Sequence, residues 1–210
     1  MGVPGPRERY RAQVQAEVKE RAWEQIARTG VAALSLKAIA QQMGMSGPAL
    51  YRYFAGRDEL VTELIRDGYR SLADTVREAC EEQPEATHVA RAVRQWALAD
   101  PHRYFLLYGT PVPGYQAPED TTAVAGEIMA VLVQVFQGTP GRDGALEENL
   151  DQHRHWAPSE SVPTNVLHRA LSFWTRVHGV LSLELAGHFT GMGFDPALLF
   201  DAEVESLLRG

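Results

Sequence analysis

Hydrophobic residues recur with a helical period near the start of the chain. Between residues 7 and 29 every fourth position is apolar, and charged side chains separate the apolar ones, which are Val14, Val18, Ala22 and Ile26. This spacing is typical of an amphipathic helix that buries one face. Gly30 follows and suits the residue after a helix end. The pattern therefore predicts a helix over 7–29.

Two short helical segments and one long helix are predicted next. Ser35 stands before a run that stops at Gly44, so its hydroxyl can cap a second helix. Ser46 begins a third segment over 46–54. Pro48 falls in its first turn, where the missing backbone N–H costs no intrahelical hydrogen bond. A fourth helix is predicted over 57–82. Its inner face contains Leu60, Leu64, Tyr69, Leu72 and Val76.

The rest of the chain continues with helices between strong breakers. Helices are predicted over 86–99, 101–108, 119–137, 163–189 and 195–208. The segment 111–118 reads as a loop. Residues 138–162 are rich in Gly, Pro and charge and show no apolar stripe, so we expect a mobile surface loop there. Because no segment alternates like a strand, the pattern predicts an all-α fold.

The helix over 163–189 has an unusually wide apolar surface. One seam is spaced alternately four and three residues apart and consists of Leu167, Leu171, Trp174, His178, Leu181, Leu185 and His188. A second stripe beside it consists of Ala170, Phe173, Val177 and Val180. Such a helix can pack inside its own subunit and against a second one. We expect a homodimer through the helices 163–189 and 195–208. The alternative is a monomer in which this is the central core helix.

Charge is distributed unevenly along the chain. The net charge of −7 argues weakly against a polyanionic partner. Residues 1–57, however, hold nine Lys or Arg against four Glu, a balance of +5, which leaves −12 for the remainder. A basic module on an acidic body favours a protein with one DNA-facing end, the alternative being chance clustering of solvated charges.

Two further features restrict the class of protein. The sequence has no run of eighteen apolar residues and no apolar stretch near its start, so we expect a cytoplasmic protein without a membrane partner. Cys80 is the only cysteine, which excludes an internal disulfide and a Cys-x-x-Cys zinc site. We interpret it as a packing or surface residue, with a redox role as the alternative.

The second and third segments have the dimensions of a helix-turn-helix, with Gly44 permitting the tight turn. In such a unit the second helix enters the major groove and the first crosses the DNA backbone. The exposed N-terminal half of the second helix then meets base edges. Here this half presents Ser46, Gly47, Pro48, Ala49, Arg52 and Tyr53.

The stretch LSLKAIAQQMGMSGPALYRYFAGRDEL resembles the DNA-binding segment of the TetR family of transcriptional regulators. The residues in register are Ser35, Ile39, Ala40, Gly44, Ser46, Leu50, Tyr51, Phe54, Asp58 and Leu60. Further on, Trp174 and the pair His178-Gly179 are similar to a W…HG signature of one branch of the family's ligand domains. The resemblance implies a three-helix DNA-binding domain over 1–56 and a helical bundle for ligand binding and dimerisation over 57–210, linked by the helix 57–82.

The resemblance also implies roles for individual residues. Ile39, Ala40, Leu50 and Phe54 are expected in the core. Ser35, Lys37, Ser46, Tyr51 and Arg57 are expected to bind phosphates. The family usually has lysine where this chain has Arg57, and a guanidinium can still bind phosphate. Arg52 and Tyr53 are expected to contact bases, with phosphate contacts alone as the alternative. The expected base contact of the next three residues is apolar, to a thymine methyl group, because their side chains have little hydrogen-bonding reach; they are Gly47, Pro48 and Ala49.

For the bundle, the resemblance implies an apolar pocket among the fourth to eighth helices. The candidates for its lining are Trp96, Phe105, Tyr108, Met129, Phe136, Phe173, Trp174 and His178. For each of them the alternative is an ordinary core position.

The expected function is a regulator without a cofactor. It represses from a palindromic operator and is released by a small hydrophobic or amphipathic effector. One alternative is a DNA-binding regulator with no effector. The other is a metal-dependent enzyme using His153 and His155, which we disfavour because no further ligands at suitable spacing and no catalytic fingerprint accompany them.

Overall fold

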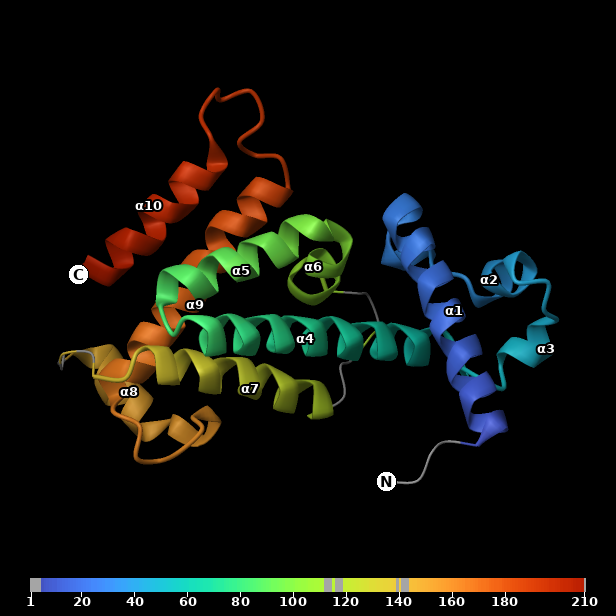
Figure 1. Ribbon diagram of the computed structural model, residues 1–210, viewed down its shortest axis with the longest axis horizontal. Helices are drawn as coiled ribbons and strands as arrows, with labels where there is room; N and C mark the ends of the chain where they lie inside the picture. Colours follow the sequence, from blue (N-terminus) through green and yellow to red (C-terminus); the bar gives the residue numbers. More distant parts are fainter. Residues whose placement is uncertain (1–4, 112–114, 116–118, 139, 141–143, 210) are drawn as a thin grey trace. The chain divides into compact units, whose positions relative to one another are not determined.

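The computed structural model describes residues 5–111, 115, 119–138, 140 and 144–209, and within these ranges the chain is helical and contains no strand (Figure 1). The all-α prediction is therefore confirmed. The chain divides into two compact units. The first takes its residues from Met1–Gly68 and His102–Pro118, and the second from Tyr69–Pro101 and Glu119–Gly210.

The first unit is built on three helices at the start of the chain, which we call the head. They are α1 (Pro6–Thr29), α2 (Leu36–Gln42) and α3 (Gly47–Leu50), with a 3-10 turn at Val31–Ala33 after α1. The predicted apolar stripe of α1 is buried, and it packs with the residues expected in the core, namely Ile39, Ala40, Leu50 and Phe54. These helices therefore hold a small common core.

Two other helices contribute to the first unit. One is the beginning of α4 (Arg57–Glu82), and the other is α6 (Pro101–Tyr108), whose residues from His102 onward belong here. The guanidinium carbon of Arg103 lies 5.7 Å from the ring centroid of Trp23 on α1. Tyr104 is fully buried, and its ring lies 5.5 Å from those of Phe105 and Tyr108. Helix α6 thus meets α1 through the cation–π contact of Arg103 with Trp23.

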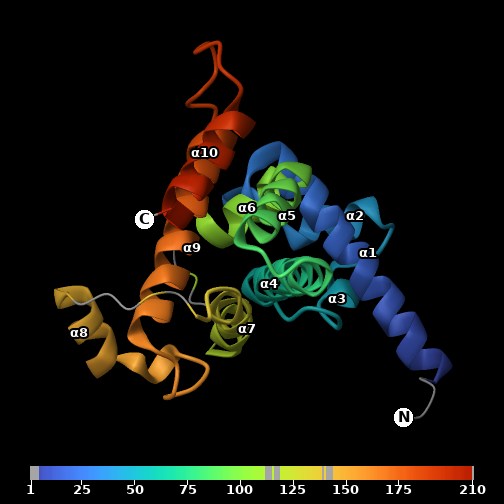
Figure 2. The ribbon, with the colours of Figure 1, turned by 60° about the vertical axis from the view of Figure 1, so that its left-hand side comes forward.

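The second unit is organised around α9 (Thr164–Leu185). This helix contacts α5 (Ala86–Ala99), α7 (Glu119–Val135), α8 (Ala145–Gln152) and α10 (Pro196–Arg209). Helix α10 runs antiparallel to α9, and α8 lies against the opposite end of α9 from the connecting loop (Figures 1 and 2). Arg94 of α5 forms a bidentate ion pair with Glu184 of α9, and both side chains are mostly buried. The centre of this unit is therefore one long helix with neighbours on several sides.

The prediction of a mobile surface loop over 138–162 was wrong for residues 145–156, while residues 139 and 141–143 lie outside the described part of the chain. The segment contains α8 and a further 3-10 turn at Arg154–Trp156. Glu147 on α8 is buried and lies 2.5 Å from Nδ1 of His168 on α9, and Leu150 is buried beside it. Because these partners come from a distant helix, the local pattern of residues 145–152 does not reveal them.

The end of the long helix was also predicted too late. Helix α9 stops at Leu185, where Gly187 has a φ of 77°. The amide of His188 donates to the carbonyl of Leu183 and that of Gly187 to the carbonyl of Glu184, which is a Schellman motif. His188, predicted on the apolar seam, lies beyond the helix. At the next helix, the carboxylate of Asp195 accepts from the amide of Ala197, so the predicted cap is confirmed.

No helix in the described part of the chain is long and apolar enough to cross a bilayer.

Candidate nucleic-acid interface

Helix α2 is fixed at its start by hydrogen bonds to the segments on either side. The hydroxyl of Ser35 accepts from the amide of Ala38 at 3.3 Å, which confirms the predicted cap. The amide of Ser35 in turn donates to Oε1 of Gln25 at 3.1 Å, and Gln25 is a buried side chain of α1. The first turn of α2 is therefore anchored to α1 by a polar contact inside the head.

The turn between α2 and α3 is a Schellman motif. Gly44 has a φ of 65°, a left-handed conformation that residues with a Cβ adopt only at a cost. The amide of Met45 donates to the carbonyl of Ala40 at 2.8 Å, and the amide of Gly44 to that of Gln41 at 3.2 Å. This pattern closes α2 and reverses the chain within a few residues. The predicted role of the glycine is confirmed.

The recognition segment is shorter than the predicted 46–54 helix. Regular α-helix covers only Gly47–Leu50, and hydrogen-bonded turns continue to Tyr53. The amides of Arg52 and Tyr53 donate to carbonyls three residues back, which tightens the backbone. Burial of Leu50 and Phe54 holds the middle and the end of the segment against the core. Ser46 stands at the N-cap without a side-chain hydrogen bond.

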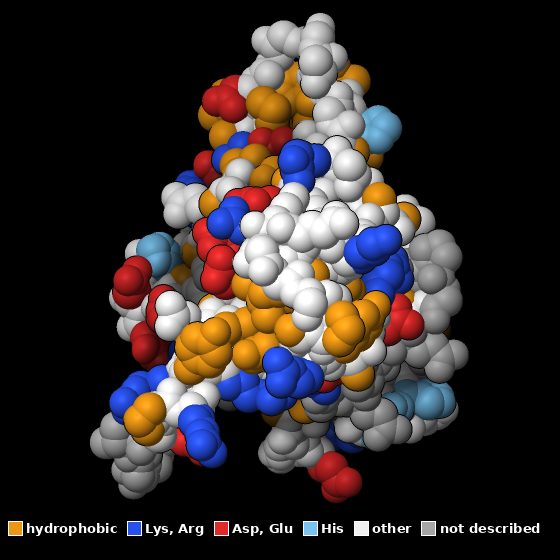
Figure 3. All heavy atoms as spheres, turned by 90° about the vertical axis from the view of Figure 1, so that its right-hand side faces the viewer, with side chains coloured by type: hydrophobic (Ala, Val, Ile, Leu, Met, Phe, Trp, Pro, Cys, Tyr) orange, Lys and Arg blue, Asp and Glu red, His pale blue; other side chains and the backbone are white. Residues whose placement is uncertain are grey.

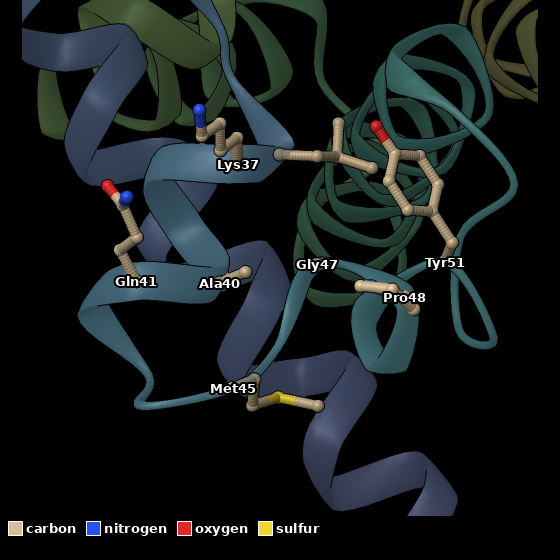
Figure 4. Close-up of a pocket in the computed structure, with 8 residues that line it drawn as sticks. Lys37, Ala40, Gln41, Met45, Gly47, Pro48 and Tyr51 are labelled. Carbon is tan, nitrogen blue, oxygen red and sulfur yellow. The ribbon is translucent and has the colours of Figure 1, made fainter.

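A hollow of about 320 Å³ lies between α2 and the recognition segment. It is lined by Leu36, Lys37, Ala40, Gln41, Met45, Gly47, Pro48 and Tyr51. In Figure 4, Ala40 and Pro48 face each other across it, with Lys37 and Tyr51 toward one end and Met45 toward the other. Its lining is mainly apolar, and Lys37, Gln41 and Tyr51 contribute polar groups. Figure 3 shows the same character on this face, where exposed hydrophobic side chains are bordered by Lys and Arg.

Several of the predicted DNA-contacting residues are exposed, and Lys37, Pro48 and Tyr51 among them line this hollow. Lys37, Ser46, Pro48, Tyr51 and Arg52 are exposed, whereas Ser35, Gly47, Ala49 and Tyr53 are partly covered. Sequence reasoning missed Gln41 and Met45, which line the same hollow. The spacing of four residues between Lys37 and Gln41 puts both on one helical face, so Gln41 could have been found from it.

Arg57 differs from the other predicted contacts because it already has protein partners. Its Nη2 donates to the carbonyl of Val31 at 3.0 Å, and its Nη1 lies 3.2 Å from the carboxylate of Asp58. The side chain therefore joins the start of α4 to the turn after α1. A phosphate contact by Arg57 would have to share the remaining N–H groups of the guanidinium.

The predicted pocket-lining residues are divided between the two units. Phe105 and Tyr108 belong to the first unit, and the others belong to the second. Within the second, Phe136 and Phe173 are buried with ring centroids 5.5 Å apart, as expected of core residues. Trp96 donates from Nε1 to the hydroxyl of Ser71 at 3.0 Å. The pockets described in this unit are lined by other side chains, among them Cys80, His88, Arg91 and Asp201.

Trp174 and His178 form the most distinctive polar-aromatic pair of the second unit. Their rings lie edge to face on α9 with centroids 4.2 Å apart. Burial lowers the pKa of His178 to about 4, so its imidazole is neutral at pH 7. Met129 on α7 is half-buried. Trp174 and His178 thus combine an apolar ring surface with a neutral polar group, an arrangement that suits a ligand pocket and an ordinary core alike.

The described residues give no support to the alternative of a metal-dependent enzyme. Nδ1 of His153 lies 2.9 Å from the carbonyl of Asn149, within α8 and its end. Throughout the described ranges, no three His, Cys, Asp or Glu side chains are grouped so that they could hold a metal ion.

An anchored short helix, a Schellman turn, a recognition segment and the exposed cations Lys37 and Arg52 together define a DNA-binding protein of the helix-turn-helix class. Comparison with known proteins agrees. Residues 20–64 match the family model for bacterial regulatory proteins of the tetR family, and residues 86–207 match the tetracyclin repressor-like C-terminal domain. The chain therefore belongs to the TetR family of transcriptional regulators.

Individual relatives span almost the whole chain. The HTH-type transcriptional regulator Rv1816 of Mycobacterium tuberculosis is 36% identical over 97% of this chain and 94% of its own length. The solved structure of SCO4313 is 62% identical, covers 98% of this chain and all of its own, and has a TM-score of 0.92. The TetR-family regulator PfmR from Thermus thermophilus shares the fold, with a TM-score of 0.59, 16% identity, and coverage of 92% of this chain and 97% of its own.

Proposed function

We propose that this regulator is a ligand-responsive repressor that binds a palindromic operator as a homodimer. The observation that carries the proposal is the helix-turn-helix with exposed Lys37, Tyr51 and Arg52 on the two segments that the hydrogen-bonded turn joins. A repressor acts where the chromosome lies, so we place the protein in the cytoplasm. The two predicted domains, 1–56 and 57–210, divide these tasks between DNA binding and effector binding.

Phosphate contacts would fix the register of the head on the duplex. Lys37, Ser46 and Tyr51 are exposed and can reach the backbone. The hydroxyl of Ser35 accepts the Ala38 amide, but its own proton remains able to bind a phosphate oxygen. Arg57 would contribute through the N–H groups that Val31 and Asp58 leave unused.

Base recognition would combine one cationic side chain with an apolar surface. The exposed guanidinium of Arg52 can pair with the O6 and N7 edge of guanine. Gly47, Pro48 and Ala49 carry no side-chain donor, so contact with a thymine methyl group is the direct readout open to them.

Dimerisation would use an exposed face of α9 together with α10. Thr175, Arg176, Gly179 and Leu183 are exposed and lie on one side of α9. Leu183 is 46% exposed, and Leu198 on α10 is 69% exposed. A Cβ added at Gly179 would meet no atom within 4 Å in the chain, so this position is open to a close-packed partner helix. A two-fold pairing here would present two heads to a symmetric operator.

Effector binding would involve the apolar surface around Trp174 and His178 in the second unit. Helix α4 contributes residues to both units. An effector that binds one arrangement of the bundle better than another would therefore shift the separation of the two heads. DNA would be released because the two arrangements differ in their affinity for the operator. The effector class that suits an apolar pocket is a small hydrophobic or amphipathic molecule.

DNA-binding measurements on purified protein test the proposal. A duplex selected from a random library should bind with strong salt dependence. Lys37→Ala should weaken binding to selected and random duplexes alike and reduce the salt slope by about two, one for each chain of the dimer. Arg52→Ala should instead reduce the preference between the two duplexes, by roughly 1–3 kcal/mol at one base pair. Equal loss on both duplexes for Arg52→Ala would contradict its base-reading role.

Two further measurements test the dimer and the effector. Light scattering should give twice the chain mass for the parent protein and a smaller mass for Leu183→Glu. A thermal-shift screen of small amphipathic compounds should find one that raises the melting temperature and weakens DNA binding. A response to operator alone would favour the regulator without an effector. A monomer with no salt-sensitive affinity for any duplex would overturn the proposal.

A further inference from the structure

One face of α1 changes its chemistry along the helix. From Val14 onward this face is apolar and buried, with Val18 and Ala22 fully covered. Arg11 lies seven residues before Val18, and Arg7 lies one turn earlier still. At about 100° per residue, both arginines project from the same side as the buried stripe. The side of α1 that is buried from Val14 onward therefore carries two arginines near the start of the helix. Figures 1 and 2 show this start of α1 extending beyond α2 and α3.

This cationic face lies next to the recognition segment. The guanidinium carbon of Arg11 is 5.7 Å from the ring centroid of Tyr53. Tyr53 immediately precedes the buried Phe54 in the chain. Nε2 of Gln15, one turn further along α1, donates to the carbonyl of Tyr53 at 3.5 Å. The start of α1 is thus held against the end of the recognition segment by a ring contact and a hydrogen bond.

The stacking leaves Arg11 able to bind an anion. A guanidinium that lies over an aromatic face keeps its N–H groups directed outward in its own plane. Arg11 and Arg7 are both exposed, whereas Tyr53 is half-buried. Tyr53 therefore has the geometry of a platform for Arg11.

We propose that Arg7 and Arg11 form a second DNA contact, to the phosphate backbone that flanks the bases facing α3, with Tyr53 as the positioning residue for Arg11. The inference rests on the proposed DNA binding by the head and differs from the sequence-based expectation that Tyr53 reads a base. The partner is duplex DNA because both arginines lie on the face of α1 that meets Tyr53 of the recognition segment, and the exposed Lys37 and Arg52 add positive charge to the same head. Phosphates recur along the duplex at short, regular intervals, so a contact outside the read bases is independent of sequence.

The chain provides a matched control for this test. Arg9 lies on the same helical turn but on the opposite face of α1. Alanine favours helix at all three positions, so Arg7→Ala with Arg11→Ala and the single Arg9→Ala should fold like the parent chain, as circular dichroism can verify. The charge change per arginine is identical.

The experiment compares two duplexes chosen from the same random-library selection. One keeps about ten base pairs, roughly one helical turn, on each side of the selected site, and the other is trimmed to the selected bases. The double variant should lose roughly tenfold in affinity for the long duplex and about four units of salt slope, two from each chain of the dimer, with little loss on the trimmed one. Arg9→Ala should lose less than about twofold. The inference would be overturned if Arg9→Ala lost as much affinity per arginine as the double variant does. It would also be overturned if the double variant lost as much affinity for the trimmed duplex as for the long one.

Substitutions at Tyr53 test its role as a platform. Tyr53→Phe keeps the ring and should leave affinity and sequence preference unchanged. Tyr53→Leu should lose as much as Arg11→Ala, and in an Arg11→Ala background it should cost nothing more. A lost base preference in Tyr53→Phe would overturn the positioning role. If the parent protein binds no duplex, the proposed function fails; if the double variant binds the long duplex like the parent, only this inference fails.

Discussion

In the first unit the candidate site lies on short segments shaped by local hydrogen bonds, whereas in the second the candidate residues lie on long helices that meet through packing. Lys37 and Arg52 are exposed and support no core. Phe173 and its neighbour Phe136 are buried, and any ligand role they have is inseparable from holding the bundle together. Function and stability can therefore be changed separately in the head but only together in the bundle.

The largest effect is expected from a truncation in the bundle. Phe173 is fully buried on the central helix α9. Phe173→Ala should lower the free energy of unfolding by about 3–5 kcal/mol, because it removes apolar contacts and leaves a cavity. Urea unfolding followed by circular dichroism measures this at fixed protein concentration. Gln95→Ala, at an exposed position on α5, should change stability by less than about 0.5 kcal/mol. A similar loss for Lys37→Ala would contradict the contrast between the units.

A pH-dependent effect of nearly this size is expected at His178. Its pKa is lowered to about 4 in the folded chain and returns toward its ordinary value of 6.5 on unfolding. Between these values the unfolded chain binds more protons, so the contribution to stability is complete above pH 6.5 and is lost as the pH falls toward 4. The difference amounts to up to about 3 kcal/mol.

Unfolding measured across this range in His178→Gln provides the comparison. The other titrating groups are common to both proteins. The variant should therefore show a flatter fall in stability between pH 6.5 and 4 than the parent. Parallel curves would show that the imidazole is not held neutral in the folded bundle.

Two glycines sharpen the comparison at the level of the backbone. Neither Gly44 in the head nor Gly126 on α7 would bring an added Cβ within 4 Å of a neighbouring atom, so steric contact is not the issue. Gly44→Ala should destabilise by about 1–2 kcal/mol, because its φ is left-handed. Gly126→Ala should stabilise by about 0.5–1 kcal/mol, since it lies within a helix. Thermal unfolding should show a lower melting temperature for Gly44→Ala and a higher one for Gly126→Ala. A shift in the same direction for both variants would contradict the role given to the backbone conformation.

The smallest effect concerns the apolar part of the recognition segment. Replacing single thymines by deoxyuridine in a selected duplex removes one methyl group at a time. At a base that meets Pro48 or Ala49, the loss should be about 0.8 kcal/mol, or roughly fourfold in affinity. Fluorescence anisotropy with each substituted duplex measures it. Uniform affinity across all the substituted duplexes would exclude methyl readout.

Much of the head could be predicted because its determinants are close in sequence. Ser35 caps a helix through an amide three residues away, and Gly44 closes it through carbonyls a few residues back. Helix α8 could not be predicted in the same way, since Glu147 is held by His168 on another helix. The stacking of Arg11 on Tyr53 likewise joins residues far apart in the chain.

The sequence by itself determined the all-helical class, the helix-turn-helix and the basic head, because helical period, caps and left-handed glycines act within a few residues. Only the tertiary structure decided that α9 ends at Leu185, that its most exposed side carries Gly179 and Leu183, and that Tyr53 lies under Arg11. Burial and stacking depend on which distant segments meet, and a local pattern specifies only that a face is apolar or charged, not its partner.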